Sequence, residues 1–145
     1  MQNKPKVFKA IITALLASII FITSYLLTYL IVGGVLYLLV RMPLIGKLID
    51  LLFFFRGDTP DMALALLCPG VAYYVTMFAQ AAMNKETRTR GLSCVLHGAG
   101  IVLLQVISIV INLIYGDGIL ANITQLVAGF AIFSGGMGEL KETDL

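Results

Sequence analysis

Four long stretches of the chain contain no charged side chain, and together they cover most of its length. All ten Lys and Arg residues and all eight Asp and Glu residues lie outside these stretches, which run over 10–40, 62–84, 91–116 and 118–138. The hydrocarbon core of a bilayer is roughly 30 Å thick and takes about 20 apolar residues of helix to cross. Within it, only a helix or a closed barrel satisfies every backbone N–H and C=O. The pattern predicts an all-α integral membrane protein, a bundle of four transmembrane helices.

Proline, glycine and charged residues set the expected ends of these helices. We expect a single transmembrane domain, residues 1–145, whose spanning helices cover about 10–40, 60–84, 91–115 and 118–137. Between the first two, 43–56 (PLIGKLIDLLFFFR) is too short to span a bilayer. Its Lys47 and Asp50 form a narrow polar wedge, which is typical of an interfacial amphipathic helix. We place this helix at the outer membrane surface, with a re-entrant position left open.

The distribution of Lys and Arg predicts the orientation, because cytoplasmic loops carry the excess of positive charge. With four spans, both termini lie on one side together with the loop that holds Lys85, Arg88 and Arg90. That side carries seven of the ten positive residues, and the other carries Arg41, Lys47 and Arg56. We therefore expect a multi-pass protein of the cell membrane whose N- and C-termini are cytoplasmic.

Composition supports this class and limits the partners. Charged residues make up 12% of the chain and hydrophobic residues 59%, whereas soluble domains carry about 25% charged residues. The net charge of +2 is explained mostly by the topology and gives no reason to expect nucleic acid. The first apolar stretch is far longer than the 7 to 15 residues expected of a signal peptide, so we expect it to be retained. The expected partner is the lipid bilayer itself.

A stripe of polar residues runs along the last two predicted spans. Residues spaced by three or four share one face of a helix, and here they are His97, Ile101, Gln105, Ser108 and Asn112, followed by Asn122, Gln125 and Gly129. The connecting turn is so short that the two helices must be antiparallel neighbours. Counting from Asp117 in both directions, we expect Asn112 to meet Asn122 and Ser108 to meet Gln125.

Two interpretations of this stripe remain open. As a structural zipper, its amides and hydroxyls bond one another at roughly 0.6 to 2 kcal/mol each and fix the rotation of the helices. As a solute path, the stripe converges at mid-membrane depth with Tyr73 and Thr76 of the second span and binds a neutral or weakly charged polar molecule. Gln105, near the middle of its span, is the residue on which the second interpretation depends.

Small residues mark the faces where helices are expected to pack, because they let backbones approach closely in lipid. The candidates are Ala17, Ser24, Gly98, Gly129 and Gly135. A bundle of this size leaves much of its surface free for other subunits. We therefore expect either a larger membrane-protein partner or a homo-oligomer.

Candidate catalytic and metal-binding groups are scarce. No Asp, Glu, Lys or Arg lies within a span, and His97 is the single histidine, so proton coupling is not indicated. Cys68 and Cys94 lie at different depths, too far apart for a disulfide. We expect no enzyme activity, no metal and no cofactor.

These observations favour a small non-catalytic membrane subunit or scaffold that acts through helix packing with membrane partners. The alternative is a small oligomeric channel or facilitator for a neutral or weakly charged polar solute, lined by the polar stripe. The two differ in one structural respect, namely whether the polar face of the last two spans is packed shut or borders a cavity.

Overall fold

The computed structural model describes residues 4–53 and 59–144. This part of the chain forms helices and no strand, in the order α1 (Lys4–Val40), α2 (Pro43–Phe53), α3 (Thr59–Met83), α4 (Thr87–Tyr115) and α5 (Leu120–Asp144). The expected short helix over 43–56 is present as α2, and its residues 54–56 lie outside the described part. Helix α3 continues through Pro69.

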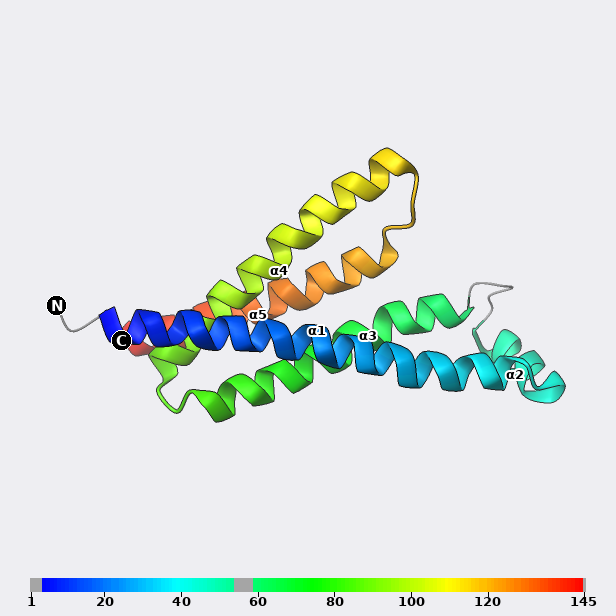
Figure 1. Ribbon diagram of the computed structural model, residues 1–145, viewed down its shortest axis with the longest axis horizontal. Helices are drawn as coiled ribbons and strands as arrows, with labels where there is room; N and C mark the ends of the chain where they lie inside the picture. The colour runs from blue at the N-terminus through cyan, green and yellow to red at the C-terminus, as the bar shows by residue number, and fades with distance from the viewer. Residues whose placement is uncertain (1–3, 54–58, 145) are drawn as a thin grey trace.

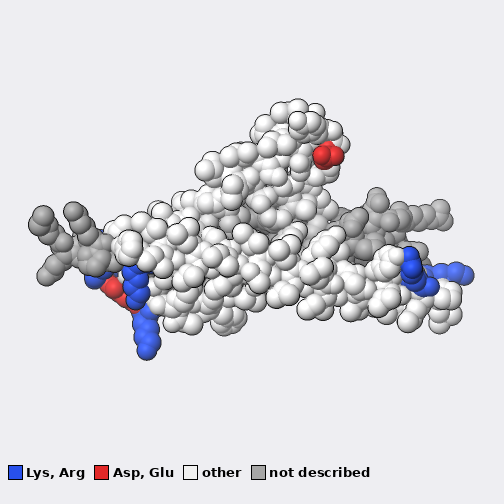
Figure 2. Space-filling view, viewed as in Figure 1, with Lys and Arg blue, Asp and Glu red and all other residues white. Residues whose placement is uncertain are grey.

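Four of these helices, α1, α3, α4 and α5, are long and apolar enough to cross a membrane. Their exposed surface is covered by large hydrophobic side chains over most of their length. In Figure 2, the visible charged side chains lie near the ends of the molecule, and the broad band between them is uncharged. This distribution matches a bilayer as the surrounding solvent.

All four long helices extend beyond the uncharged stretches into charged sequence. Helix α1 begins at Lys4, α3 at Thr59 and α4 at Thr87, while α5 continues to Asp144. At its other end, α5 begins at Leu120 instead of 118, because the chain turns out of the helix at Gly116 and is not helical again until Leu120. Gly116 has φ +77°, the left-handed conformation that favours glycine at the end of a helix. The end of an uncharged stretch therefore does not mark the end of a helix.

The long helices form two antiparallel pairs, α1 with α3 and α4 with α5 (Figure 1). Across the pairs, α1 contacts α4 and α5 contacts α3. Helices α3 and α4, although consecutive in the chain, therefore lie diagonally across the bundle. The pairs pack together at the end that holds both termini and diverge toward the end that holds the α4–α5 turn. We call these the inner end and the outer end.

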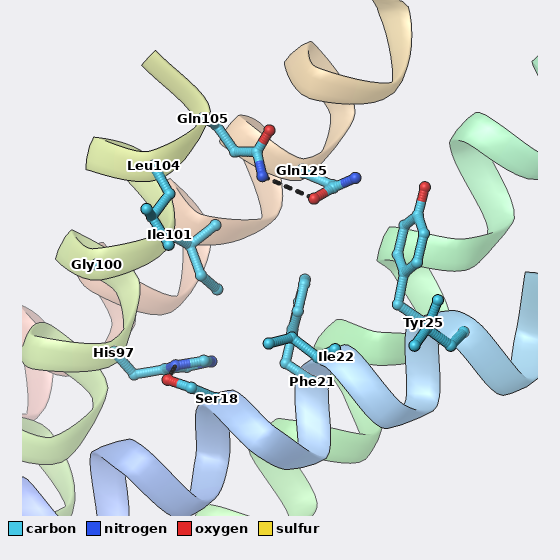
Figure 3. Close-up of a pocket in the computed structure, with 11 residues that line it drawn as sticks. Ser18, Phe21, Ile22, Tyr25, His97, Gly100, Ile101, Leu104, Gln105 and Gln125 are labelled. Atoms are coloured by element: carbon cyan, nitrogen blue, oxygen red, sulfur yellow. Dashed lines mark hydrogen bonds between the residues drawn. The ribbon is translucent and has the colours of Figure 1, made fainter. Parts of the chain in front are cut away.

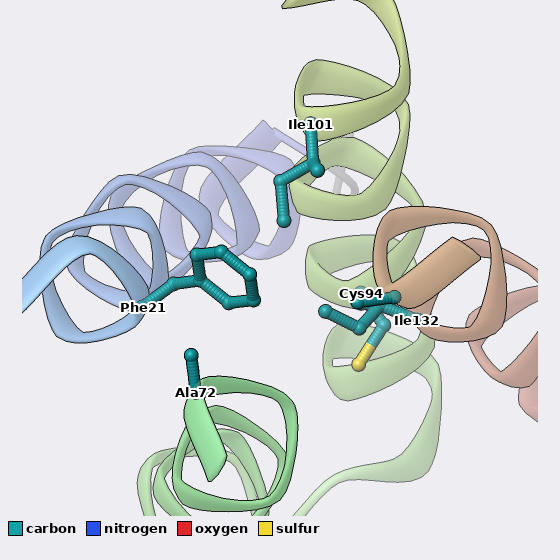
Figure 4. Close-up of a cluster of buried hydrophobic side chains, with 6 residues drawn as sticks. Phe21, Ala72, Cys94, Ile101 and Ile132 are labelled. Carbon is teal, nitrogen blue, oxygen red and sulfur yellow. The ribbon is translucent and has the colours of Figure 1, made fainter. Parts of the chain in front are cut away.

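The hydrophobic core lies where the two pairs begin to diverge. Every long helix contributes to it (Figure 4), and its buried members are Phe21, Ala72, Cys94, Ile101, Ala128 and Ile132. Ile132 is completely buried, and Phe21 reaches from α1 toward the other helices. The core thus brings side chains of all four long helices together.

Glycine allows α4 and α5 to touch through their backbones. A Cβ atom added to Gly98 would lie 2.5 Å from the backbone nitrogen of Phe133, and one on Gly136 would lie 2.7 Å from the backbone oxygen of Gly91. A Cβ on Gly129 would meet Ile101 at 2.6 Å. No larger residue fits at these positions unless the helices separate.

The five predicted packing residues have different environments. Gly98 and Gly129 lie in the α4–α5 contact, and Ala17 is completely buried. Ser24 is half-buried. Gly135 differs from the expectation, because it is exposed and a Cβ there would meet nothing within 4 Å. Its neighbour Gly136 is the packing residue, since successive helical residues point about 100° apart and only one of the two faces α4.

Candidate functional site

Five polar side chains link α4 to α5 near the outer end, and we call them the amide network: Gln105, Ser108, Asn112, Asn122 and Gln125. The Nδ2 group of Asn122 donates to Gln105 Oε1 at 2.9 Å and to Ser108 Oγ at 2.8 Å. Its Oδ1 accepts from Asn112 Nδ2 at 2.8 Å. Gln105 Nε2 also donates to Gln125 Oε1 at 2.8 Å. Asn122 is thus the centre of the network.

One pairing in the amide network differs from the pairing expected from the sequence. Asn112 meets Asn122, but Ser108 bonds Asn122 and not Gln125. The reason is the non-helical segment before α5, since a residue outside a helix can advance by up to about 3.3 Å and a helical one advances by about 1.5 Å. Residues of α5 consequently lie deeper than equal counting from Asp117 suggests, and Gln125 reaches Gln105.

A pocket of about 280 Å³ lies between α1 and α4 just outside the core. Figure 3 shows Phe21, Ile22 and Tyr25 of α1 on one side and Gly100, Ile101 and Leu104 of α4 on the other. Gln105 and Gln125 lie together at its outer wall, bonded to each other, and Ser18 and His97 lie at its inner wall. Most of its lining is apolar.

A second pocket, of about 410 Å³, lies between α3 and α5. Tyr73, Pro69 and Gly70 line it from α3, opposite Val127 and Ala131 of α5. Each pocket thus contains a glycine, Gly100 or Gly70, whose added Cβ would meet nothing within 4 Å.

The two residues of the second span proposed for the solute path separate in the structure. Tyr73 lines the α3–α5 pocket, whereas Thr76 is completely buried on the inner side of the core. Neither lines the α1–α4 pocket with Gln105. The structure therefore does not bring Tyr73, Thr76 and Gln105 to one cavity.

His97 is 3% exposed and lies between α4 and α1. Its Nδ1 is 2.8 Å from Ser18 Oγ, and its ring meets Phe21 edge to face with centroids 5.9 Å apart. The predicted polar stripe therefore divides at Ile101. The part beyond it belongs to the amide network, and His97 belongs to a different group of buried side chains.

This second group, which we call the inner polar cluster, consists of Thr76, Gln80, Asn84, Ser93 and His97. Thr76, Gln80 and Asn84 recur every fourth residue on α3 and just beyond its end, and Ser93 and His97 do so on α4. Cys94 Sγ donates to Gln80 Oε1, which joins the two sides across the bundle. Sequence reasoning identified only Thr76 and His97, although the four-residue spacing of Thr76, Gln80 and Asn84 is a readable signal.

Ion pairs lie outside this cluster at the inner end. Lys6 Nζ is 2.7 Å from Glu86 Oε1, and Arg90 Nε is 2.7 Å from Glu139 Oε1. The hydrogen bonds from Lys6 and Thr89 hold the pKa of Glu86 below its ordinary value of 4.5. Through the first pair, α1 is tied to the connection between α3 and α4.

A seven-residue repeat underlies the α4–α5 contact and was missed by sequence reasoning. Gly91, Gly98, Gln105 and Asn112 recur at this interval on α4, and Asn122, Gly129 and Gly136 recur on α5. Such a spacing keeps one seam facing a partner helix. The glycines occupy the inner half of the seam and the amides its outer half.

The described residues contain no group of three or more His, Cys, Asp or Glu side chains that could hold a metal ion. Cys68 and Cys94 are both buried free thiols. What the arrangement offers is hydrogen bonding by neutral groups and helix surface. The chain matches no protein-family model, no curated protein and no solved structure.

Proposed function

We propose that this protein is a small non-catalytic subunit or scaffold of the cell membrane, which receives a transmembrane helix of a partner between its two helix pairs. The observation that carries the proposal is the state of the predicted polar stripe. Its amides bond one another within the α4–α5 pair. Groups that satisfy each other in this way stabilise a helix contact and leave little capacity for a passing solute.

The position of the core supports the same conclusion. Along α4, the order is Ser93 and His97, then the buried Ile101, then Gln105. Along α3, in the direction of the outer end, Thr76 is followed by the completely buried Ala72. Apolar side chains thus lie between the inner and the outer polar groups along both helices. Of the inner polar cluster, only His97 shares the α1–α4 pocket with Gln105, and that pocket is mostly apolar, so it offers a polar solute little.

The two pockets between the pairs are suited to a helix. Gly100 and Gly70 line them without any neighbour at the position of a Cβ atom. Inside the molecule, glycine at Gly98, Gly129 and Gly136 serves close backbone contact. A glycine in an open, mostly apolar pocket favours the backbone of another helix as the occupant. Close approach of two helix backbones requires small residues, whereas contact with a lipid chain does not.

The proposed topology places both termini and the α3–α4 connection in the cytoplasm. The Lys6–Glu86 contact puts the N-terminal helix beside that connection, and the Lys and Arg excess lies at this end. Helix α2 then lies at the outer surface, and its exposed Leu44 and Leu48 suit contact with lipid there.

Site-specific photo-crosslinking tests the proposal. Leu104 is 65% exposed and lines the α1–α4 pocket, while Phe130 of α5 is 62% exposed and lies outside both pockets. A benzophenone side chain at Leu104 should give one protein adduct of fixed mass in membranes, and Gly100→Leu should abolish it by filling the pocket. The same side chain at Phe130 should label lipid.

The mass of the adduct distinguishes a second copy of this chain from a different membrane protein. Lipid adducts alone at Leu104 would contradict the proposal. So would purified protein in liposomes that passes urea or glycerol, with the flux lost in Gln105→Leu and retained in Phe130→Leu, because that result assigns the chain to the facilitator class.

A further inference from the structure

The inner polar cluster contains side chains that are buried without being satisfied by protein groups. Thr76, Gln80, Asn84 and Ser93 are 0% exposed. Six of the cluster's side-chain atoms find no hydrogen-bond partner among the described residues: Thr76 Oγ1, Gln80 Nε2, Asn84 Nδ2, Asn84 Oδ1, Ser93 Oγ and His97 Nε2. The amide network has no such buried atom within residues 4–53 and 59–144.

The ring of His97 contributes one of these unpaired atoms. Ser18 Oγ lies within hydrogen-bond distance, 3.0 Å, of the backbone oxygen of Ala14. Ser18 Oγ also lies 2.8 Å from His97 Nδ1, and the tautomer of the ring decides which of the two atoms donates. In either tautomer Nε2 lacks a partner among the described residues, as a donor in one and as an acceptor in the other.

The remaining atoms need both hydrogen-bond donors and hydrogen-bond acceptors as partners. The amide nitrogens of Gln80 and Asn84 are donors, Asn84 Oδ1 is an acceptor, and the hydroxyls of Thr76 and Ser93 are both. None of these five side chains is acidic or permanently charged. The matching ligand is a small neutral molecule that donates and accepts hydrogen bonds.

We propose that the inner polar cluster binds ordered water molecules, which form a hydrated site inside the helix bundle. A buried donor or acceptor without a partner costs about 1–3 kcal/mol, and nine-tenths or more of such groups in proteins are paired. Buried water typically makes about three hydrogen bonds to groups of this kind. A few water molecules would satisfy all six atoms.

The water reaches the cluster from the inner end. Asn84 lies directly after α3, beside the connection to α4. Glu139 Oε2, the second oxygen of the Arg90 ion pair, is another buried atom without a partner in the described chain. On the opposite side, Phe21, Ala72 and Ile101 belong to the hydrophobic core, and His97 also lines the α1–α4 pocket. The proposed hydrated site therefore lies between the inner end and the core.

Radiolytic footprinting of the protein in nanodiscs tests this inference, because X-ray pulses turn bound water into hydroxyl radicals that oxidise adjacent sulfur. Cys94 is bonded to Gln80 in the cluster, whereas Cys68 is just as buried elsewhere on α3. We expect Cys94 to be oxidised on the order of tenfold faster than Cys68, since bound water lies next to only one of them.

Two variants and one control sharpen the test. Ser93→Ala and Asn84→Leu should each slow the oxidation of Cys94 severalfold. Ser134→Ala removes an exposed serine bonded to its own helix and should leave the rate unchanged. Equal, slow oxidation of Cys94 and Cys68 would overturn the inference, as would a Cys94 rate unaffected by Ser93→Ala in folded protein. Neither Ser93 nor Asn84 lines the α1–α4 pocket or the α3–α5 pocket, so these results test the hydrated site separately from the proposed function.

Discussion

The inner and outer ends of the bundle both hold buried or half-buried polar side chains, but they satisfy them differently. At the outer end, Asn122 alone makes three hydrogen bonds to α4. At the inner end, Gln80 and Ser93 are more deeply buried and yet leave Nε2 and Oγ without partners among the residues described. Polarity along a transmembrane helix therefore does not by itself indicate a pore or a zipper, because the packing around each group decides its role.

The contact between α4 and α5 also differs between the inner end and the outer end. The inner end is closed by glycines, which bring α4 and α5 into direct contact. At the outer end the hairpin diverges from α1 and α3, and amide side chains bridge its two helices. At the inner end the α4–α5 contact depends on the absence of side chains, and at the outer end it depends on specific side chains.

The largest effect is expected from Gly98→Ala, which tests the closed end. The added methyl group would lie 2.5 Å from the Phe133 backbone nitrogen and 2.7 Å from the Gly129 oxygen. Because neither backbone can rotate away, we expect a loss of about 3 kcal/mol, at the upper end for overpacked sites. Gly100→Ala, on the same helix with no neighbour within 4 Å, is the control. Equal stability of the two variants in denaturant titrations of micelles would contradict the comparison.

A smaller loss is expected from Asn122→Leu, which tests the outer end. Three interhelical bonds disappear, and at roughly 0.6 kcal/mol each the variant should lose about 2 kcal/mol. Thr124→Val provides the control, since Thr124 Oγ1 bonds the carbonyls of Leu120 and Ala121 in its own helix. Spin labels on α4 and α5 near the turn should also report a wider distance distribution in Asn122→Leu. An unchanged distribution and stability would show that the amide network is not needed for the contact.

The smallest effect is expected from Glu86→Gln at the surface of the inner end. Lys6 and Glu86 are about half exposed, and pairs of this kind contribute little. Because the folded-state pKa of Glu86 lies below its ordinary value, its contribution is present above about pH 4.5 and is lost as pH falls through the folded-state value. Melting temperatures of wild type and variant should therefore differ slightly at pH 7 and converge under acidic conditions. A difference that grows as pH falls would contradict this.

The helices themselves could be predicted from the sequence because the bilayer imposes a simple rule on charge and length. Each uncharged stretch corresponds to one long helix. The ends of the helices could not be predicted, since α1 and α4 continue into charged sequence over residues 4–9 and 87–90. Apolarity reports the solvent around a helix, whereas helix ends depend on local backbone hydrogen bonds.

The candidate site could be predicted only in part. Spacing places Gln105, Ser108 and Asn112 on one face, and the short turn places α5 beside it, so the zipper follows from local rules. The inner polar cluster depends on the diagonal arrangement of α3 and α4, which no turn length specifies. Gly135 and Gly136 likewise look the same in the sequence, and only the rotation of α5 decides which one faces α4.

The alternation of glycine and amide along the α4–α5 seam has a consequence for alignment. A displacement of one helix by seven residues in one direction would bring Gly98 opposite Asn122, and a displacement in the other direction would bring Gln105 opposite Gly129. In either register a carboxamide would face a glycine, and the hydrogen bond between Asn122 and Gln105 would be lost. The residue pattern of α4 and α5 thus specifies the axial register of the two helices, independently of the loop that joins them.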